Sequence, residues 1–119
     1  MRTAEIAARV LEIIPDESHW IKGFSHDSQG RHCVLGGLDV IMREEAVDSG
    51  TYLVCALYAG RFAAAFLATA RELYPDLCAY MREDASAGPA TASFNDDPDV
   101  TYGHVRTVLE KIRAREDAA

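Results

Sequence analysis

The chain has 119 residues, of which 49% are hydrophobic and 26% charged, and its formal net charge is −7. This length corresponds to a single domain, 1–119, which can bury enough apolar surface to fold without disulfides or bound metals. The acidic balance disfavours nonspecific nucleic-acid binding, because neutralising phosphates requires clustered lysine and arginine. We therefore expect one folded domain with no nucleic-acid partner.

Three further features favour a location in the cytoplasm. The longest apolar run, 53–70, is interrupted by Gly60, Arg61 and Thr69, so it predicts a buried helix and no membrane span. The first ten residues include Glu5 and lack a long apolar core, unlike a secretory signal. The three cysteines are odd in number and widely spaced, which is typical of reduced thiols.

The first predicted element is an amphipathic helix near the N-terminus. Its apolar residues recur at helical spacing: Ile6, Val10, Ile13 and Ile14. Pro15 and the polar residues after it end the helix.

The stretch 19–38 is the most unusual part of the sequence. It holds the only tryptophan, three of the four histidines and four of the eight glycines. Two β-favouring pieces, 19–24 and 31–34, flank a polar turn that ends at Gly30. We expect a small β-hairpin here, which must lean on helices because an isolated hairpin is marginally stable.

Two more helices are predicted at 33–45 and 52–74. Gly36 and Gly37 lie near the start of the first of them, where each glycine costs about 1 kcal/mol of helix propensity relative to alanine. Close packing of another backbone or of an aromatic ring against the bare helix surface would compensate. We expect Trp20 and Phe94 to cover this surface.

The C-terminal third completes the expected fold. Residues 83–93 are small and polar and contain the Gly88–Pro89 pair, which predicts a surface loop. Thr101 is a good N-cap for a last helix, and the tail 114–119 should fray. The predicted fold is mainly α, with four to five helices around one core and a small β-hairpin near residues 19–34.

Three short motifs give the chain a resemblance to a known family. They are Trp-x-x-Gly at Trp20 and Gly23, Gly-Arg-x-Cys-x-x-Gly at Gly30, Cys33 and Gly36, and aromatic-Asn-Asp at Phe94, Asn95 and Asp96, followed by Thr101. With these motifs the chain resembles an uncharacterised domain-of-unknown-function family of actinobacteria and their bacteriophages. It departs from that family at Gly37, where alanine is preferred, and at Phe94, where tryptophan is usual. The resemblance implies a fold and a host range but no mechanism.

Cys33 is the strongest candidate for catalytic chemistry. It lies at a predicted helix N-terminus, where the helix dipole favours thiolate. His32 is adjacent in sequence and is therefore poorly placed as its base. A triad would have to recruit His104 with Asn95 or Asp96, which the spacing does not indicate. A buried small side chain is the simpler interpretation of Cys33.

The sequence contains no standard metal or nucleotide motif. The histidine and cysteine spacings match no zinc pattern. The acidic run 95–99 has the composition of a calcium loop, but Val100 stands where the turn glycine belongs and Arg106 where the bidentate glutamate belongs. Asn95 and Asp96 are better explained as turn and capping residues.

We interpret the sequence as a noncatalytic protein-interaction or assembly module in the cytoplasm of a bacterial host, with no catalytic residue, metal, cofactor or membrane partner. Its target would be a host or partner protein. The alternative is a small cysteine-dependent hydrolase-like enzyme that uses Cys33 and a histidine. The apolar surplus in 52–74 fits an intramolecular core and a homodimer equally well. The residues expected to matter for structure or interaction are Trp20, Gly23, Gly30, Cys33, Gly36, Gly37, Phe94, Asn95, Asp96 and Thr101.

Overall fold

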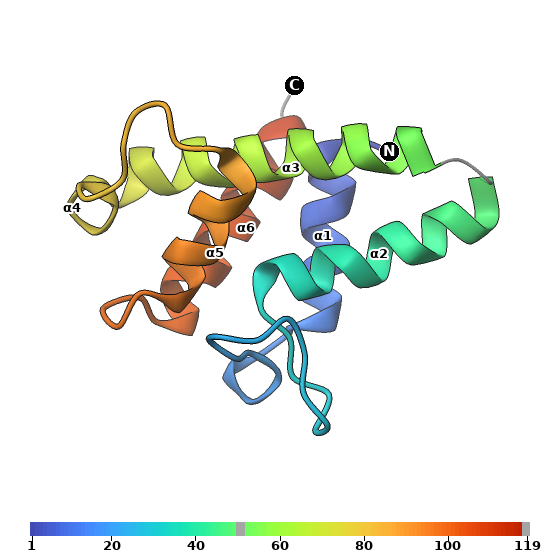
Figure 1. The fold of residues 1–119 in the computed structure, drawn as a ribbon, viewed down its shortest axis with the longest axis horizontal. Helices are drawn as coiled ribbons and strands as arrows, with labels where there is room; N and C mark the ends of the chain where they lie inside the picture. Colours follow the sequence, from blue (N-terminus) through green and yellow to red (C-terminus); the bar gives the residue numbers. More distant parts are fainter. Residues whose placement is uncertain (50–51, 118–119) are drawn as a thin grey trace.

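Six α-helices and one 3₁₀ turn make up most of the chain in a computed structural model, which describes residues 1–49 and 52–117 (Figure 1). The helices are α1 (Thr3–Ile13), α2 (Val34–Ser49), α3 (Tyr52–Leu73), α4 (Pro75–Cys78), α5 (Ala87–Asp96) and α6 (Tyr102–Asp117), and the turn η1 spans Glu17–His19. The expectation of a mainly α fold is confirmed, but the described residues form six helices where four to five were expected.

Helix α1 is amphipathic, as its spacing predicts, and its apolar face lies at the centre of the molecule. Ile6 and Val10 are fully buried, and the helix ends at Ile13, two residues before Pro15. It packs against α6 most extensively and also contacts α2 and α3. In Figure 1, α1 and α6 form a layer behind α2, α3 and α5.

Aromatic side chains from α3 and α5 form the other half of the core. Phe62, Phe66 and Phe94 are fully buried. The Phe66 and Phe94 rings meet edge to face at 5.8 Å between centroids, a favoured aromatic geometry. Phe94 therefore ties α5 to α3.

The prediction of a β-hairpin at 19–34 is wrong. The described residues contain only isolated bridges, between Trp20 and His32 and between His26 and His32, and no strand. The Asp27 carboxylate accepts hydrogen bonds from the backbone amides of Gln29 and Arg31, at 3.0 and 2.9 Å. These amides are thus satisfied by a side chain instead of by a strand ladder. Residues 20–33, which we call the α2 loop, fold back at the lower end of the molecule in Figure 1.

The prediction of a surface loop at 83–93 is wrong for residues 87–93, because α5 begins at Ala87. Pro89 is tolerated there because amides in the first turn of a helix have no intrahelical acceptor. Burial of Thr91 and Phe94 then stabilises the helix. At the C-terminus, α6 continues to Asp117, so residues 114–117 are helical and not frayed, while 118–119 lie outside the described residues.

None of the helices, as far as the structure describes them, combines the length and the apolar character needed to cross a membrane.

Candidate functional site

Asn95 joins three separate parts of the chain. Its side chain is fully buried at the end of α5, and its Oδ1 accepts hydrogen bonds from Trp20 Nε1 at 2.7 Å and from the backbone amide of Val34 at 3.3 Å. Its Nδ2 donates to the carbonyl of Ile21 at 3.1 Å and to Asp96 Oδ1 at 3.0 Å. Both ends of the amide are therefore satisfied, as a buried polar group requires. Asn95 fixes the α2 loop and the start of α2 to α5.

The residues that follow Asn95 hold the α2 loop at a second point. Asp96 Oδ1 accepts a hydrogen bond from the Gly23 amide at 2.8 Å, and Lys22 Nζ donates to the carbonyl of Asp97. Gly23 has a φ of +82°, a conformation that favours glycine. Lys22 Nζ also lies 5.5 Å from the centre of the Trp20 ring, within cation–π range. The sequence motifs around residues 20–23 and 94–96 thus meet in space.

Trp20 packs against Tyr102, a residue that the sequence did not single out. Its ring centroid lies 6.1 Å from that of Tyr102, whose hydroxyl donates to the carbonyl of Ile14 at 2.6 Å. Burial raises the pKa of the Tyr102 phenol. Tyr102 thereby links the start of α6 to the end of α1.

Gly36 and Gly37 are covered by different groups from those expected. A Cβ at Gly36 would lie 1.7 Å from the carbonyl oxygen of Ser25, so only glycine fits under the α2 loop at this position. A Cβ at Gly37 would lie 3.4 Å from Val10 Cγ1 in α1, an ordinary contact. The prediction of close backbone packing is confirmed for Gly36. The prediction that Trp20 and Phe94 cover the pair is wrong.

Cys33 lies beneath the same loop. It is 8% exposed, and its Sγ accepts a hydrogen bond from the Gly36 amide at 3.3 Å. Burial raises the pKa of the Cys33 thiol, which favours the neutral form over the nucleophilic thiolate. Among the described residues, no imidazole lies within hydrogen-bond distance of this sulfur. The structure therefore does not bring together the base and nucleophile that a cysteine hydrolase needs.

His104, the other candidate base, has a role at the start of α6. Its Nδ1 accepts a hydrogen bond from the Thr101 amide at 2.9 Å, and Thr101 Oγ1 accepts one from the His104 amide at 3.4 Å. This reciprocal pair is a capping box with histidine in the position usually taken by glutamate. The predicted N-cap role of Thr101 is confirmed.

Gly30 and Asp27, by contrast with His32, have local partners. Gly30 has a φ of +79° and donates its amide to the Asp27 carbonyl at 3.3 Å, closing the turn of the α2 loop. Hydrogen bonds from the Arg31 and Gln29 amides and the Arg31 side chain lower the pKa of Asp27.

No group of three or more metal-ligating side chains occurs in the part of the chain that the structure describes. His32 Nδ1 is buried without a hydrogen-bond partner among those residues.

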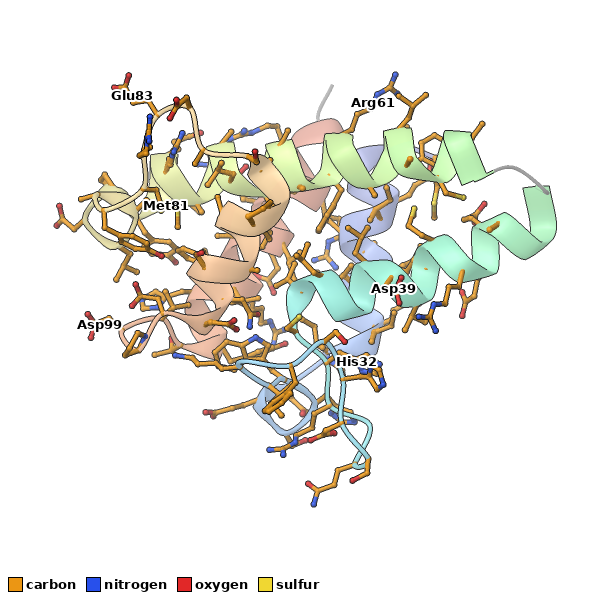
Figure 2. All side chains as sticks on the ribbon, in the orientation of Figure 1. His32, Asp39, Arg61, Met81, Glu83 and Asp99 are labelled. Carbon is orange, nitrogen blue, oxygen red and sulfur yellow. The ribbon has the colours of Figure 1, made fainter. Side chains whose placement is uncertain are left out.

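The surface feature best suited to binding is a cleft of about 350 Å³ between α2 and α3, which we call the α2–α3 cleft. Its lining is mostly apolar and consists of Leu35, Leu38, Asp39, Met42, Arg43, Cys55, Ala56 and Ala59. The two charged residues neutralise each other, since Arg43 Nη2 lies 2.9 Å from Asp39 Oδ2. Leu57, next to Ala56 in α3, is 61% exposed. Figure 2 labels Asp39 on α2 and shows Arg61 projecting from the side of α3 that faces away from α2.

Sequence reasoning missed Ser25, Tyr102 and the whole α2–α3 cleft. Gly36 indicated that another part of the chain packs closely against the start of α2. The partner is the backbone carbonyl of Ser25, and because any residue has such a carbonyl, the identity of Ser25 could not predict the contact. The cleft depends on the angle between α2 and α3, which the sequence does not give. The small side chains of Ala56 and Ala59 leave space beside α3 at this point.

Comparisons with known proteins place the chain in a family without assigning it an activity. No curated protein and no solved structure matches the chain. A family model described as "Family of unknown function (DUF6197)" matches residues 1–115, which is nearly the whole sequence. The chain belongs to this family of unknown function.

Proposed function

We propose that the protein is a noncatalytic protein-interaction module, and that its α2–α3 cleft receives an apolar side chain of a partner protein. The observation that carries this proposal is the cleft itself, a mostly apolar hollow between α2 and α3. Following the family resemblance drawn from its motifs, we place the chain in the cytoplasm of an actinobacterial host, encoded by the host or by a phage.

The size and lining of the cleft support a protein partner. Its volume of about 350 Å³ is at the small end of the range for ligand pockets, about 300–1,000 Å³. Asp39 and Arg43 form an ion pair with each other, so the cleft presents no unpaired charge from these two residues to a charged small molecule. An apolar hollow of this kind suits a side-chain anchor, as at the centre of many protein interfaces.

The cysteine-dependent enzyme has less support. Cys33 is buried, its pKa is raised, and its sulfur accepts a hydrogen bond from the Gly36 backbone amide. These contacts favour a structural role for Cys33.

Affinity capture from an actinobacterial lysate tests the proposal. The bait would be the wild-type chain, an Ala56→Arg variant that fills the cleft mouth, and an Ala114→Arg control. Ala56 and Ala114 are both exposed helical alanines, but Ala114 lies on α6 away from the cleft. The expected result is a protein captured by the wild type and Ala114→Arg and lost with Ala56→Arg. Equal capture by all three baits would contradict the proposal, as would a monomeric chain that captures nothing.

A further inference from the structure

We infer that His32 makes the α2 loop sensitive to pH: a proton on its Nδ1 atom releases the loop from the first turn of α2. Figure 2 labels His32 where this loop meets α2. The switch does not depend on the proposed binding function. It rests on the burial of Nδ1, on the charged groups around the ring and on the backbone contacts of His32.

The ring nitrogen of His32 that must take a second proton is the buried one. Nδ1 is buried without a hydrogen-bond partner, the only side-chain nitrogen or oxygen among the described residues in that condition. Nε2 has no protein partner there either but is not buried, so the single N–H of the neutral ring can lie at Nε2 and reach water. Charging the ring adds an N–H at Nδ1, where a donor without an acceptor destabilises the closed loop.

No acidic side chain compensates for this charge. His32 forms no ion pair among the described residues, so every carboxylate among them lies more than 4.0 Å from its ring nitrogens. This holds for the acidic residues of the loop and of the segments next to it: Glu12, Asp16, Glu17, Asp27, Asp39 and Asp96. The charged ring therefore lacks the partner that would hold it in place.

The basic side chains of the α2 loop disfavour the charged ring further. The His26 ring lies 6.3 Å from the His32 ring between centroids, and an imidazole gains its positive charge in the same pH range. Lys22 is a cation throughout that range, whereas Arg31 is paired with Asp27 at 2.6 Å. Like charges raise the free energy of the closed loop when His32 is protonated.

The backbone of His32 connects the ring to the contact at the start of α2. Its amide donates to the carbonyl of His19 at 2.8 Å, and its carbonyl accepts from the Ile21 amide at 3.1 Å. The next amide, that of Cys33, donates to the Ser25 carbonyl, which is the group that covers Gly36. A displacement of His32 therefore reaches the contact that holds the loop on α2.

The direction of the pH dependence follows from proton binding. In the open loop Nδ1 reaches water, so the open form binds the second proton more readily than the closed form. The form that binds more protons gains population as the pH falls. Opening should therefore increase below about pH 6.5, where an exposed imidazole titrates, and the closed loop should persist above it.

The experiment measures amide hydrogen exchange by NMR from about pH 7.5 to about pH 5.5, with each rate compared with the intrinsic rate at the same pH. In the wild type we expect the protection of the Cys33 amide to fall by up to about tenfold per pH unit below about pH 6.5. The fall should be absent in His32→Gln, which cannot take the proton. His19→Gln is the matched control, because it removes an exposed imidazole beside the loop, and it should behave as the wild type.

The wild type alone keeps the test decisive if His32→Gln does not fold. The imidazole C–H signals of His32 and the protection of the Cys33 amide should then change with the same midpoint. Constant protection of Cys33 while His32 titrates would overturn the inference. A fall that persists in His32→Gln, or one that disappears in His19→Gln, would also overturn it.

Discussion

The carbonyl oxygen of Ser25 occupies the place that a side chain at Gly36 would need, 1.7 Å from the ideal Cβ position. The same oxygen accepts a hydrogen bond from the Cys33 amide at 3.3 Å. One backbone carbonyl thus holds the α2 loop against the first turn of α2. This contact requires glycine at position 36.

The two adjacent glycines should respond differently to alanine. Gly36→Ala must displace the Ser25 backbone, so we expect it to reduce the free energy of unfolding by about 3 kcal/mol. Gly37→Ala meets Val10 and Ile13 at ordinary contact distances and gains helix propensity, so its effect should stay within about 1 kcal/mol. Urea denaturation of both variants measures the difference. Equal effects of the two substitutions would show that the α2 loop does not press on Gly36.

Asn95→Ala should loosen the α2 loop from α5. It leaves the Trp20 indole N–H, the Val34 amide and the Ile21 carbonyl without their partner, so we expect a loss of about 3 kcal/mol or more. Trp20 is the only tryptophan, so its fluorescence reports the site directly and should shift toward the red. Ser93→Ala, at an exposed position on the same helix, is the matched control. An unchanged emission spectrum in Asn95→Ala would contradict the role assigned to Asn95.

The Cys33 thiol should resist alkylation in the folded protein at neutral pH. Burial both shields the sulfur and raises its pKa, so the thiolate is scarce and inaccessible. Iodoacetamide labelling followed by peptide mass spectrometry measures Cys33 separately from the other two cysteines. The urea-unfolded chain, labelled in parallel, should react much faster. Rapid labelling of Cys33 in the folded state would reopen the cysteine-enzyme interpretation.

Stability should decrease at alkaline pH. The pKa values of Cys33, Cys78 and Tyr102 are all raised by burial, so the folded chain holds these protons after the unfolded chain has released them. When the unfolded state binds fewer protons, the free energy of unfolding falls as pH rises. The decline should begin above roughly pH 8.5, where an unfolded thiol ionises. Melting temperatures across this range test it, and Cys33→Ala should decline less steeply than the wild type. A melting temperature that rises with pH would contradict the assignment.

The sequence predicted the helices whose apolar faces follow the helical period. The amphipathic α1 and the Phe62–Phe66 face of α3 are examples, because each buries a stripe that the spacing already shows. The N-cap at Thr101 was also predictable, since capping is local chemistry.

The errors came from tertiary contacts that override local preference. Residues 87–93 contain Gly88 and Pro89 and look like a loop, yet the burial of Phe94 and Asn95 stabilises a helix there. The β-favouring residues around Trp20 form only isolated bridges among the described residues, because Asn95 binds the Ile21 carbonyl and Asp96 accepts from the Gly23 amide. Partners about 75 positions away in the chain cannot be inferred from spacing alone.

We propose that the protein binds other protein chains through the α2–α3 cleft. Methyl and amide NMR spectra, recorded while binding is induced by concentration or by a captured partner, test it most directly. We predict that the signals of Leu38, Met42 and Ala56 shift or broaden, while those of the α2 loop and of Ala114 stay in place. Shifts confined to the α2 loop or to α6, with the cleft signals unchanged, would contradict the account.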